Sequence, residues 1–156
     1  MDLSMNFNIG AILLVPICTF IHELGHALFV KLIGGKVIQV EIGAGPVLFQ
    51  IGSVAFKKMF FAGGYCSFEW PNDKTVSKFE KFLVFFGGVA MNALFIVILY
   101  FLRVHFHIKS DIIGYLNFIN SISIIICLVP FRLSIQNNRQ IISDGRRIFE
   151  LFSKNS

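Results

Sequence analysis

The chain has 156 residues, of which 55% are hydrophobic and only 15% are charged. Soluble domains carry about 25% charged residues, and so short a chain cannot hide this much apolar surface in one core. The composition therefore argues against an ordinary soluble domain and predicts a membrane protein, with one domain over residues 1–156.

The net charge of +5 does not predict a nucleic-acid partner, because the basic residues are clustered between apolar segments. None of the 14 precedes Lys31, seven lie from there to Lys81, and five follow Pro130. By the positive-inside rule, this distribution predicts an outer N-terminus and a cytoplasmic C-terminus. The richness in Ile, Phe, Lys and Asn is typical of an AT-rich bacterial genome, so we expect a multi-pass protein of a bacterial plasma membrane.

Three apolar segments, residues 9–33, 82–102 and 112–130, are long enough to cross a bilayer as helices. Between the first two, residues 37–68 are rich in β-forming side chains interrupted by glycines, which predicts short strands in a small β-hairpin or sheet at the membrane surface. The predicted fold class is therefore a mainly α membrane protein with three transmembrane helices, this membrane-associated β-hairpin or sheet, and a short C-terminal helix. A polar loop, residues 131–143, is expected before that last helix.

The first apolar segment contains the pattern H-E-x-x-H at His22, Glu23 and His26. On a helix, residues four apart lie about 40° apart around the axis and about 6 Å apart along it, so both imidazoles can reach one zinc ion. Glu23 projects beside the metal, where it can take a proton from zinc-bound water. A chance pattern, or histidines hydrogen-bonded inside a bundle, is the alternative. Polar groups in a membrane span are costly and usually functional, which favours one catalytic Zn²⁺.

A catalytic zinc needs a third protein ligand. His105, His107 and Asp111 lie between the second and third spans, on the predicted outer side, whereas the H-E-x-x-H pattern lies toward the cytoplasmic half of its span. Asp144 follows the third span and lies at the appropriate end. Asp144 also fits an ordinary helix N-cap or a turn residue, because Asp-Gly is a common turn pair.

Several motifs occur together in a fixed order: HELGH in the first span, GAGPVLFQ and FFAGGY in the β region, GGVAMN in the second span, and LVP followed by SDG after the third. In this combination, from about residue 9 to about residue 152, the chain resembles the site-2 protease family of intramembrane zinc metallopeptidases. It is similar to the three-span catalytic core of larger members.

The resemblance implies a zinc endopeptidase that cleaves in or near a transmembrane segment of a membrane protein or lipid-embedded peptide, in contact with membrane lipids. It assigns the two histidine ligands to His22 and His26, the general base to Glu23, and the third ligand to Asp144. Asn92 matches the asparagine of the family's G-x-x-x-N pattern, with a role in packing or in hydrogen bonding near the site. The active site would face a hydrated pocket on the cytoplasmic side.

Two features depart from the family pattern. Cys127 stands where the family often has an asparagine thought to contact substrate, and a thiol cannot donate an amide hydrogen bond. Asn120, two helical turns earlier, is the remaining candidate on that helix for supporting substrate or site, although the resemblance gives it no role. The loop before Asp144 is also longer than in many members, which suggests a segment that covers or gates the site.

Two further questions stay open at the level of sequence. The strands around Gly43 to Phe56 either bind an unwound substrate by edge pairing or form a plain membrane-surface hairpin. A catalytically inactive membrane protein that keeps the fold and binds or escorts a partner is the alternative function, and the complete set of predicted ligands argues against it. A soluble zinc endopeptidase is disfavoured by the composition. The sequence predicts neither the substrate nor the oligomeric state.

Overall fold

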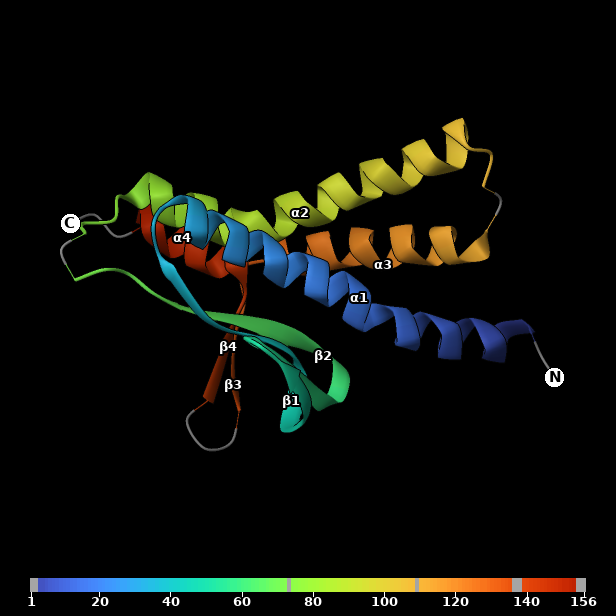
Figure 1. Cartoon of the computed structure of the whole chain (residues 1–156), viewed down its shortest axis with the longest axis horizontal. Coiled ribbons are helices and arrows are strands. Elements are labelled where there is room, and N and C mark those ends of the chain that lie inside the picture. The colour runs from blue at the N-terminus through green and yellow to red at the C-terminus, as the bar shows by residue number, and fades with distance from the viewer. Residues whose placement is uncertain (1–2, 73, 109, 136–138, 154–156) are drawn as a thin grey trace.

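A computed structural model describes residues 3–72, 74–108, 110–135 and 139–153 of the chain (Figure 1). Side chains are described for the same residues except 3–11, 134, 135 and 139. The elements in chain order are α1 (Leu3–Leu32), β1 (Lys36–Ile51), β2 (Val54–Glu69), α2 (Lys78–His105), α3 (Asp111–Leu128), β3 (Arg132–Ile135), β4 (Arg139–Ile142) and α4 (Asp144–Ser153).

Among the described residues, three helices are long and apolar enough to cross a membrane: Ile12–Leu32 within α1, and the whole of α2 and α3. Figure 1 shows them extended in roughly the same direction, with the α2–α3 connection at one end and α4 at the other. With the hairpin β1–β2 between α1 and α2, this confirms the predicted fold class.

The start of α2 is set by a capping box. The Ser77 hydroxyl accepts a hydrogen bond from Glu80 N–H at 3.2 Å, and the Glu80 carboxylate accepts one from Ser77 N–H at 2.8 Å. These reciprocal bonds satisfy backbone donors that the first helical turn leaves unpaired. As a result α2 begins at Lys78, four residues before the predicted span.

The contact between α1 and α2 depends on glycine. A Cβ atom on Gly25 would lie 2.2 Å from the carbonyl oxygen of Gly87, and one on Gly87 would lie 2.7 Å from the carbonyl oxygen of Gly25. The two backbones therefore touch directly, as small residues permit in membrane helix pairs. This close approach brings α2 against the side of α1 that carries the histidines.

The β region forms two long strands instead of several short ones. β1 and β2 have 16 residues each and are joined by a tight turn at Gly52 and Ser53. At Gly43 and Gly45 the chain bends without ending the strand, because positive φ angles of 90° and 86° are accessible to glycine. Residues 40–42, which precede the bend, pair on both sides, with residues 64–66 and with residues 54–56 of β2.

The β1–β2 sheet lies along the second half of α1. Val40, Ile42 and Cys66 form a buried cluster with Ala27 of α1. β2 also approaches the middle of α1 closely, since a Cβ atom on Gly64 would lie 2.7 Å from a side-chain carbon of Thr19. The sheet is therefore beside the helix that carries the H-E-x-x-H pattern, and not beyond its end.

The predicted polar loop at residues 131–143 is wrong in part, because most of it forms the antiparallel hairpin β3–β4. Each strand has only four residues, so the alternation in RLSI is at the shortest length that indicates a strand, and RQII does not alternate; the sequence therefore carried little strand signal. Phe131 precedes β3, and Ser143 connects β4 to α4. Residues 132–135 and 139–142 are thus paired strands, and part of this segment lines the site described below.

Candidate metal centre

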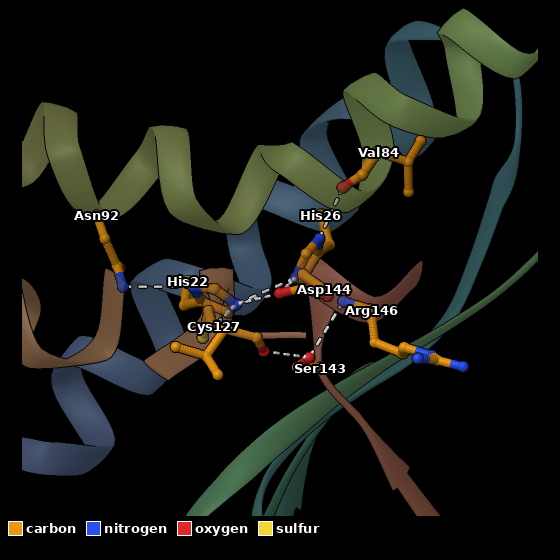
Figure 2. A network of polar contacts seen from close by, with 9 residues as sticks. His22, His26, Val84, Asn92, Cys127, Ser143, Asp144 and Arg146 are labelled. Carbon is orange, nitrogen blue, oxygen red and sulfur yellow. Dashed lines mark hydrogen bonds and ion pairs between the residues drawn. The ribbon is translucent and has the colours of Figure 1, made fainter. Parts of the chain in front are cut away.

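His22 and His26 lie one turn apart on α1 and are both buried, with 7% of each residue exposed. Their Nε2 atoms are 3.2 Å apart, and the two rings meet edge to face at a centroid distance of 4.8 Å. Two imidazoles therefore direct nitrogen atoms to the same point, as the helical spacing predicts (Figure 2).

Asp144 reaches this point from the first residue of α4. Its Oδ2 atom lies 3.1 Å from His22 Nε2 and 3.3 Å from His26 Nε2. Ser143, not Asp144, caps the helix, because its hydroxyl accepts the N–H of Arg146 at 3.2 Å and donates to the carbonyl of Val129 at 2.7 Å. The carboxylate of Asp144 is therefore free to face the histidines.

Gly145 lets α4 begin so close to the end of α3. A Cβ atom at this position would lie 2.0 Å from the carbonyl oxygen of Leu128. The glycine of the Asp-Gly pair is thus a packing requirement, and it holds the preceding carboxylate against the histidines.

The three side chains fit a tetrahedral zinc ion. Their ligand atoms lie within 4.8 Å of one another, and the three closest pairs of atoms are separated by 3.1, 3.2 and 3.3 Å. Ligands at the zinc–nitrogen and zinc–oxygen distances found in proteins lie about 3.3 Å apart in a tetrahedron. Burial alone would raise the pKa of Asp144, but hydrogen bonds from His22 and His26 lower it more, so the pKa lies well below its usual range. The carboxylate is therefore ionised near neutral pH, as a metal ligand must be.

Both histidines are oriented by partners on α2. His26 donates its Nδ1–H to the carbonyl oxygen of Val84 at 2.7 Å, which directs Nε2 at Asp144 and leaves that nitrogen to bind a metal in place of its proton. On the other ring, His22 Nδ1 lies 3.3 Å from the side-chain amide of Asn92, whose Oδ1 is buried without a partner in the described part of the chain. Turning this amide by 180° lets Oδ1 accept the Nδ1–H of His22, which gives that oxygen a partner and leaves His22 Nε2 for a metal.

Gly88 makes room for the ligand nitrogens. A Cβ atom there would lie 2.5 Å from His22 Nε2 and 2.7 Å from His26 Nε2. The histidine rings therefore pack directly against the backbone of α2. A side chain at Gly88, one helical turn before Asn92, would clash with them, which explains the glycine of the G-x-x-x-N pattern on steric grounds.

Glu23 lies beside the three convergent groups and is not one of them. It is 5% exposed, and its carboxylate faces β2, where a Cβ atom on Gly64 would lie 2.8 Å from Glu23 Oε1. β2 carries glycine at this point and so approaches the carboxylate closely. The same cavity is lined by Glu23 and by all three convergent residues.

That cavity has a volume of about 390 Å³, within the usual range of ligand pockets. Its walls come from α1, β2, α2, α3, β4 and α4. On its α3 side Cys127 Sγ lies 3.7 Å from His22 Nε2, so the thiol that replaces the family's asparagine is close to the site. On its α4 side the guanidinium of Arg147 lies over the rings of Phe85, at 5.5 Å, and Tyr65, at 5.9 Å.

The other candidates lie elsewhere. Asn120 is buried between α1 and α3, where its amide donates to the carbonyl of Leu116 at 2.7 Å and to Cys18 Sγ at 3.1 Å. The structure does not bring it to the histidines. The segment with His105 and His107, and the start of α3 beyond it, lie at the opposite end of the helices from α4 (Figure 1).

Sequence reasoning missed several residues of the cavity. The strand segment Gly43 to Phe56 does not line it, and residues of β2 from Phe61 to Phe68 do instead. The Gly-Gly pair in FFAGGY was the available signal for this close approach. Arg147 had no such signal, because a basic residue in a short C-terminal helix is usually a solvated one.

Comparison with known proteins adds a family. The model of peptidase family M50 matches residues 10–151. A Bacillus subtilis (strain 168) protein named "Uncharacterized membrane protein YwmF" is 26% identical over 141 residues, covering 90% of this chain and 84% of that protein. Proteins named "Putative zinc metalloprotease" from Borreliella burgdorferi and Helicobacter pylori (strain J99) are each 32% identical over 111 residues. Those matches cover 58% and 60% of this chain but only 26% and 32% of the two proteins, so the chain spans about a third or less of their length.

Proposed function

The chain belongs to peptidase family M50, the site-2 protease family, and from this premise we propose that it is a zinc-dependent intramembrane endopeptidase. It hydrolyses a peptide bond in or near a transmembrane segment of a membrane protein or peptide precursor. The observation that carries the proposal is the convergence of His22, His26 and Asp144 with the Glu23 carboxylate beside them in one cavity. Residues 1–156 act together as one metalloprotease domain.

In this proposal His22, His26 and Asp144 hold one zinc ion, which when bound acidifies a water molecule and polarises the scissile carbonyl. Glu23 accepts the proton of the attacking water and passes it to the leaving amine. The position of Glu23 supports this role, because its carboxylate lines the cavity without joining the ligand group. Val84 and Asn92 act through the histidines by holding each ring in the tautomer that leaves Nε2 unprotonated.

The substrate must expose a backbone carbonyl that a transmembrane helix keeps hydrogen-bonded. The peptide therefore enters unwound, and helix-breaking residues near the scissile bond favour cleavage. An extended peptide can pair with a strand edge, and residues Phe61 to Cys66 of β2 supply the edge that lines this cavity. By the distribution of basic residues, we place the N-terminus outside, the C-terminus in the cytoplasm, and the cavity toward the cytoplasmic side of a plasma membrane.

The test is the Glu23→Gln variant, expressed in cells that otherwise lack the protein. We expect uncleaved membrane-protein substrates to accumulate, with cleavage slowed about 10²- to 10⁴-fold by loss of the base. Comparing the membrane proteome of these cells with that of cells carrying the wild type identifies the substrates. Glu69→Gln, an exposed glutamate at the end of β2, is the matched control and should process them normally. Unchanged processing by Glu23→Gln would make the protease assignment untenable.

The alternative that the sequence left open is a catalytically inactive protein that binds or escorts a membrane partner, and the complete set of His22, Glu23, His26 and Asp144 argues against it. Cys127 lies beside His22, where the family often has a substrate-contacting asparagine. An escort would leave the lengths of all membrane proteins unchanged, whether Glu23 is intact or not. Deleting the whole chain would instead lower the abundance or change the location of one partner, and the Glu23→Gln variant would restore it.

A further inference from the structure

We propose that the β3–β4 hairpin is a second substrate-binding edge, so that the extended peptide lies between β2 and β4 and pairs with both. This inference rests on the proposed function, because it concerns the same cavity. It assigns to the hairpin the placement of the scissile bond relative to Glu23 and the metal ligands.

The hairpin lines the cavity with one strand only. Ile141 and Ile142 of β4 are lining residues, as are Phe131 and Ser143 at the two ends of the hairpin. No residue of β3 with a described side chain lines the cavity. Since β4 pairs with β3 on one side, its other side is the one available to the cavity.

The register shows which backbone groups point away from β3. Ser143 N–H donates to the carbonyl of Phe131 at 3.2 Å, which makes these two residues a hydrogen-bonded pair. Opposed residues of an antiparallel ladder alternate, so the next pair, Ile142 with Arg132, exchanges no hydrogen bonds. The N–H and C=O of Ile142 therefore point outward, along the free edge of β4.

β2 has a free edge at the same cavity. Its residues 64–66 pair with residues 40–42 of β1, and within the described chain no strand pairs with them on the other side. β2 and β4 belong to separate sheets, and no backbone hydrogen bond joins them within the described residues, although residues of both line one cavity. Free strand edges carry unpaired N–H and C=O groups, which beside membrane helices need water or a peptide as partner.

The position of Ile142 connects this edge to the chemistry. It lies two residues before Asp144, and Ser143 between them is held by hydrogen bonds to Val129, Phe131 and Arg146. A peptide paired with Ile142 is therefore placed at a set distance from the metal ligands. The apolar lining from Phe61, Phe131 and Ile141 favours an apolar extended segment, such as an unwound part of a transmembrane helix.

The experiment measures binding of two probes to the zinc-loaded full chain in detergent. Acetohydroxamate binds the metal alone, whereas a tripeptidyl hydroxamate of apolar residues also has a backbone that can pair. Ile142→Pro removes the outward N–H, and because this N–H does not bond β3, the hairpin can persist. We expect a roughly three- to tenfold weaker affinity for the tripeptidyl probe, the effect of one lost hydrogen bond, and no change for acetohydroxamate.

Two control variants isolate the edge. Ser134→Pro removes an N–H that points outward from β3, on the side away from the cavity, and should leave both affinities unchanged. Ile142→Ala keeps the N–H and shortens the side chain, so it should weaken the tripeptidyl probe less than the proline does. Equal losses for Ile142→Ala and Ile142→Pro would assign the effect to the side chain and overturn the pairing.

Amide hydrogen exchange in the wild type gives a readout that needs no variant. The tripeptidyl probe should slow exchange in β4 at Gln140 and Ile142, whose N–H groups point away from β3, as well as in β2, and acetohydroxamate should slow neither. Protection confined to β2 would overturn the role of the hairpin and leave the proposed function standing. A zinc-loaded wild type that binds neither hydroxamate would overturn the proposed function, and this inference with it.

Discussion

His22 Nε2 lies 3.1 Å from Asp144 Oδ2, although 122 positions separate the two residues in the chain. The contact depends on α4 beginning directly against the end of α3, where Gly145 meets the carbonyl of Leu128. With this contact, two histidines on one helix and a carboxylate from another form a group of three side chains whose spacing fits a tetrahedral zinc ion.

The first prediction concerns the third ligand. Asp144→Asn replaces a carboxylate by a neutral amide. Loss of a residue that only supports a ligand lowers metal affinity by about 10- to 100-fold, so loss of the ligand itself should lower zinc affinity by more than that. Zinc per protein, measured by elemental analysis after dialysis, should drop from one to near zero. Asp111→Asn, at the start of α3, is the matched control and should retain zinc. A full zinc complement in Asp144→Asn would remove Asp144 from the ligand set.

The second prediction separates two buried asparagines. Asn92→Ala removes the partner of His22 Nδ1, and we expect zinc affinity to fall about 10- to 100-fold. Asn120→Ala also empties a buried amide position, but its partners are Cys18 and Leu116, so zinc affinity should be unchanged. Competition with a fluorescent zinc chelator measures both. Equal losses of affinity would mean that Asn92 acts only through general stability.

The third prediction concerns the packing of α1 on α2. Gly25→Ala places a methyl group against the backbone of Gly87, and we expect a loss of unfolding free energy of about 1–3 kcal/mol or more. Gly114→Ala adds the same methyl group to α3, where no neighbouring atom of the described residues lies within 4 Å of it, and should stabilise the helix by about 0.5–1 kcal/mol. Thermal unfolding of both variants in the same detergent should show a lower melting temperature for Gly25→Ala and a higher one for Gly114→Ala. Similar melting temperatures for both variants would contradict the close contact.

The fourth prediction concerns removal of the metal. Zinc at about 100 times its dissociation constant should add about 2.7 kcal/mol of stability, because it binds the folded chain. A chelator should therefore lower the melting temperature, and added zinc should restore it. Glu23→Gln should keep this response, since Glu23 lies outside the ligand group, whereas Asp144→Asn should lose it. A chelator-insensitive wild type would speak against a bound metal ion.

Some of this architecture was readable from local pattern. The apolar segments predicted the three helices, although α1 begins at Leu3 and α2 at Lys78, earlier than expected. The hairpin predicted at residues 37–68 occupies residues 36–69. These features depend on composition and on glycine conformation within a few neighbouring residues, so they can be predicted from the local sequence.

The sequence by itself determined that His22 and His26 converge and that Glu23 stands beside them, because residues on one turn of a helix have a known separation. Only the tertiary structure decided that Asp144 completes the group, that Asn92 touches His22, and that Asn120 does not. Those contacts join residues 70 to 122 positions apart, and they depend on how closely glycines let separate helices approach. The same packing decided that edges of β2 and β4 line the cavity, which no local pattern of either strand specifies.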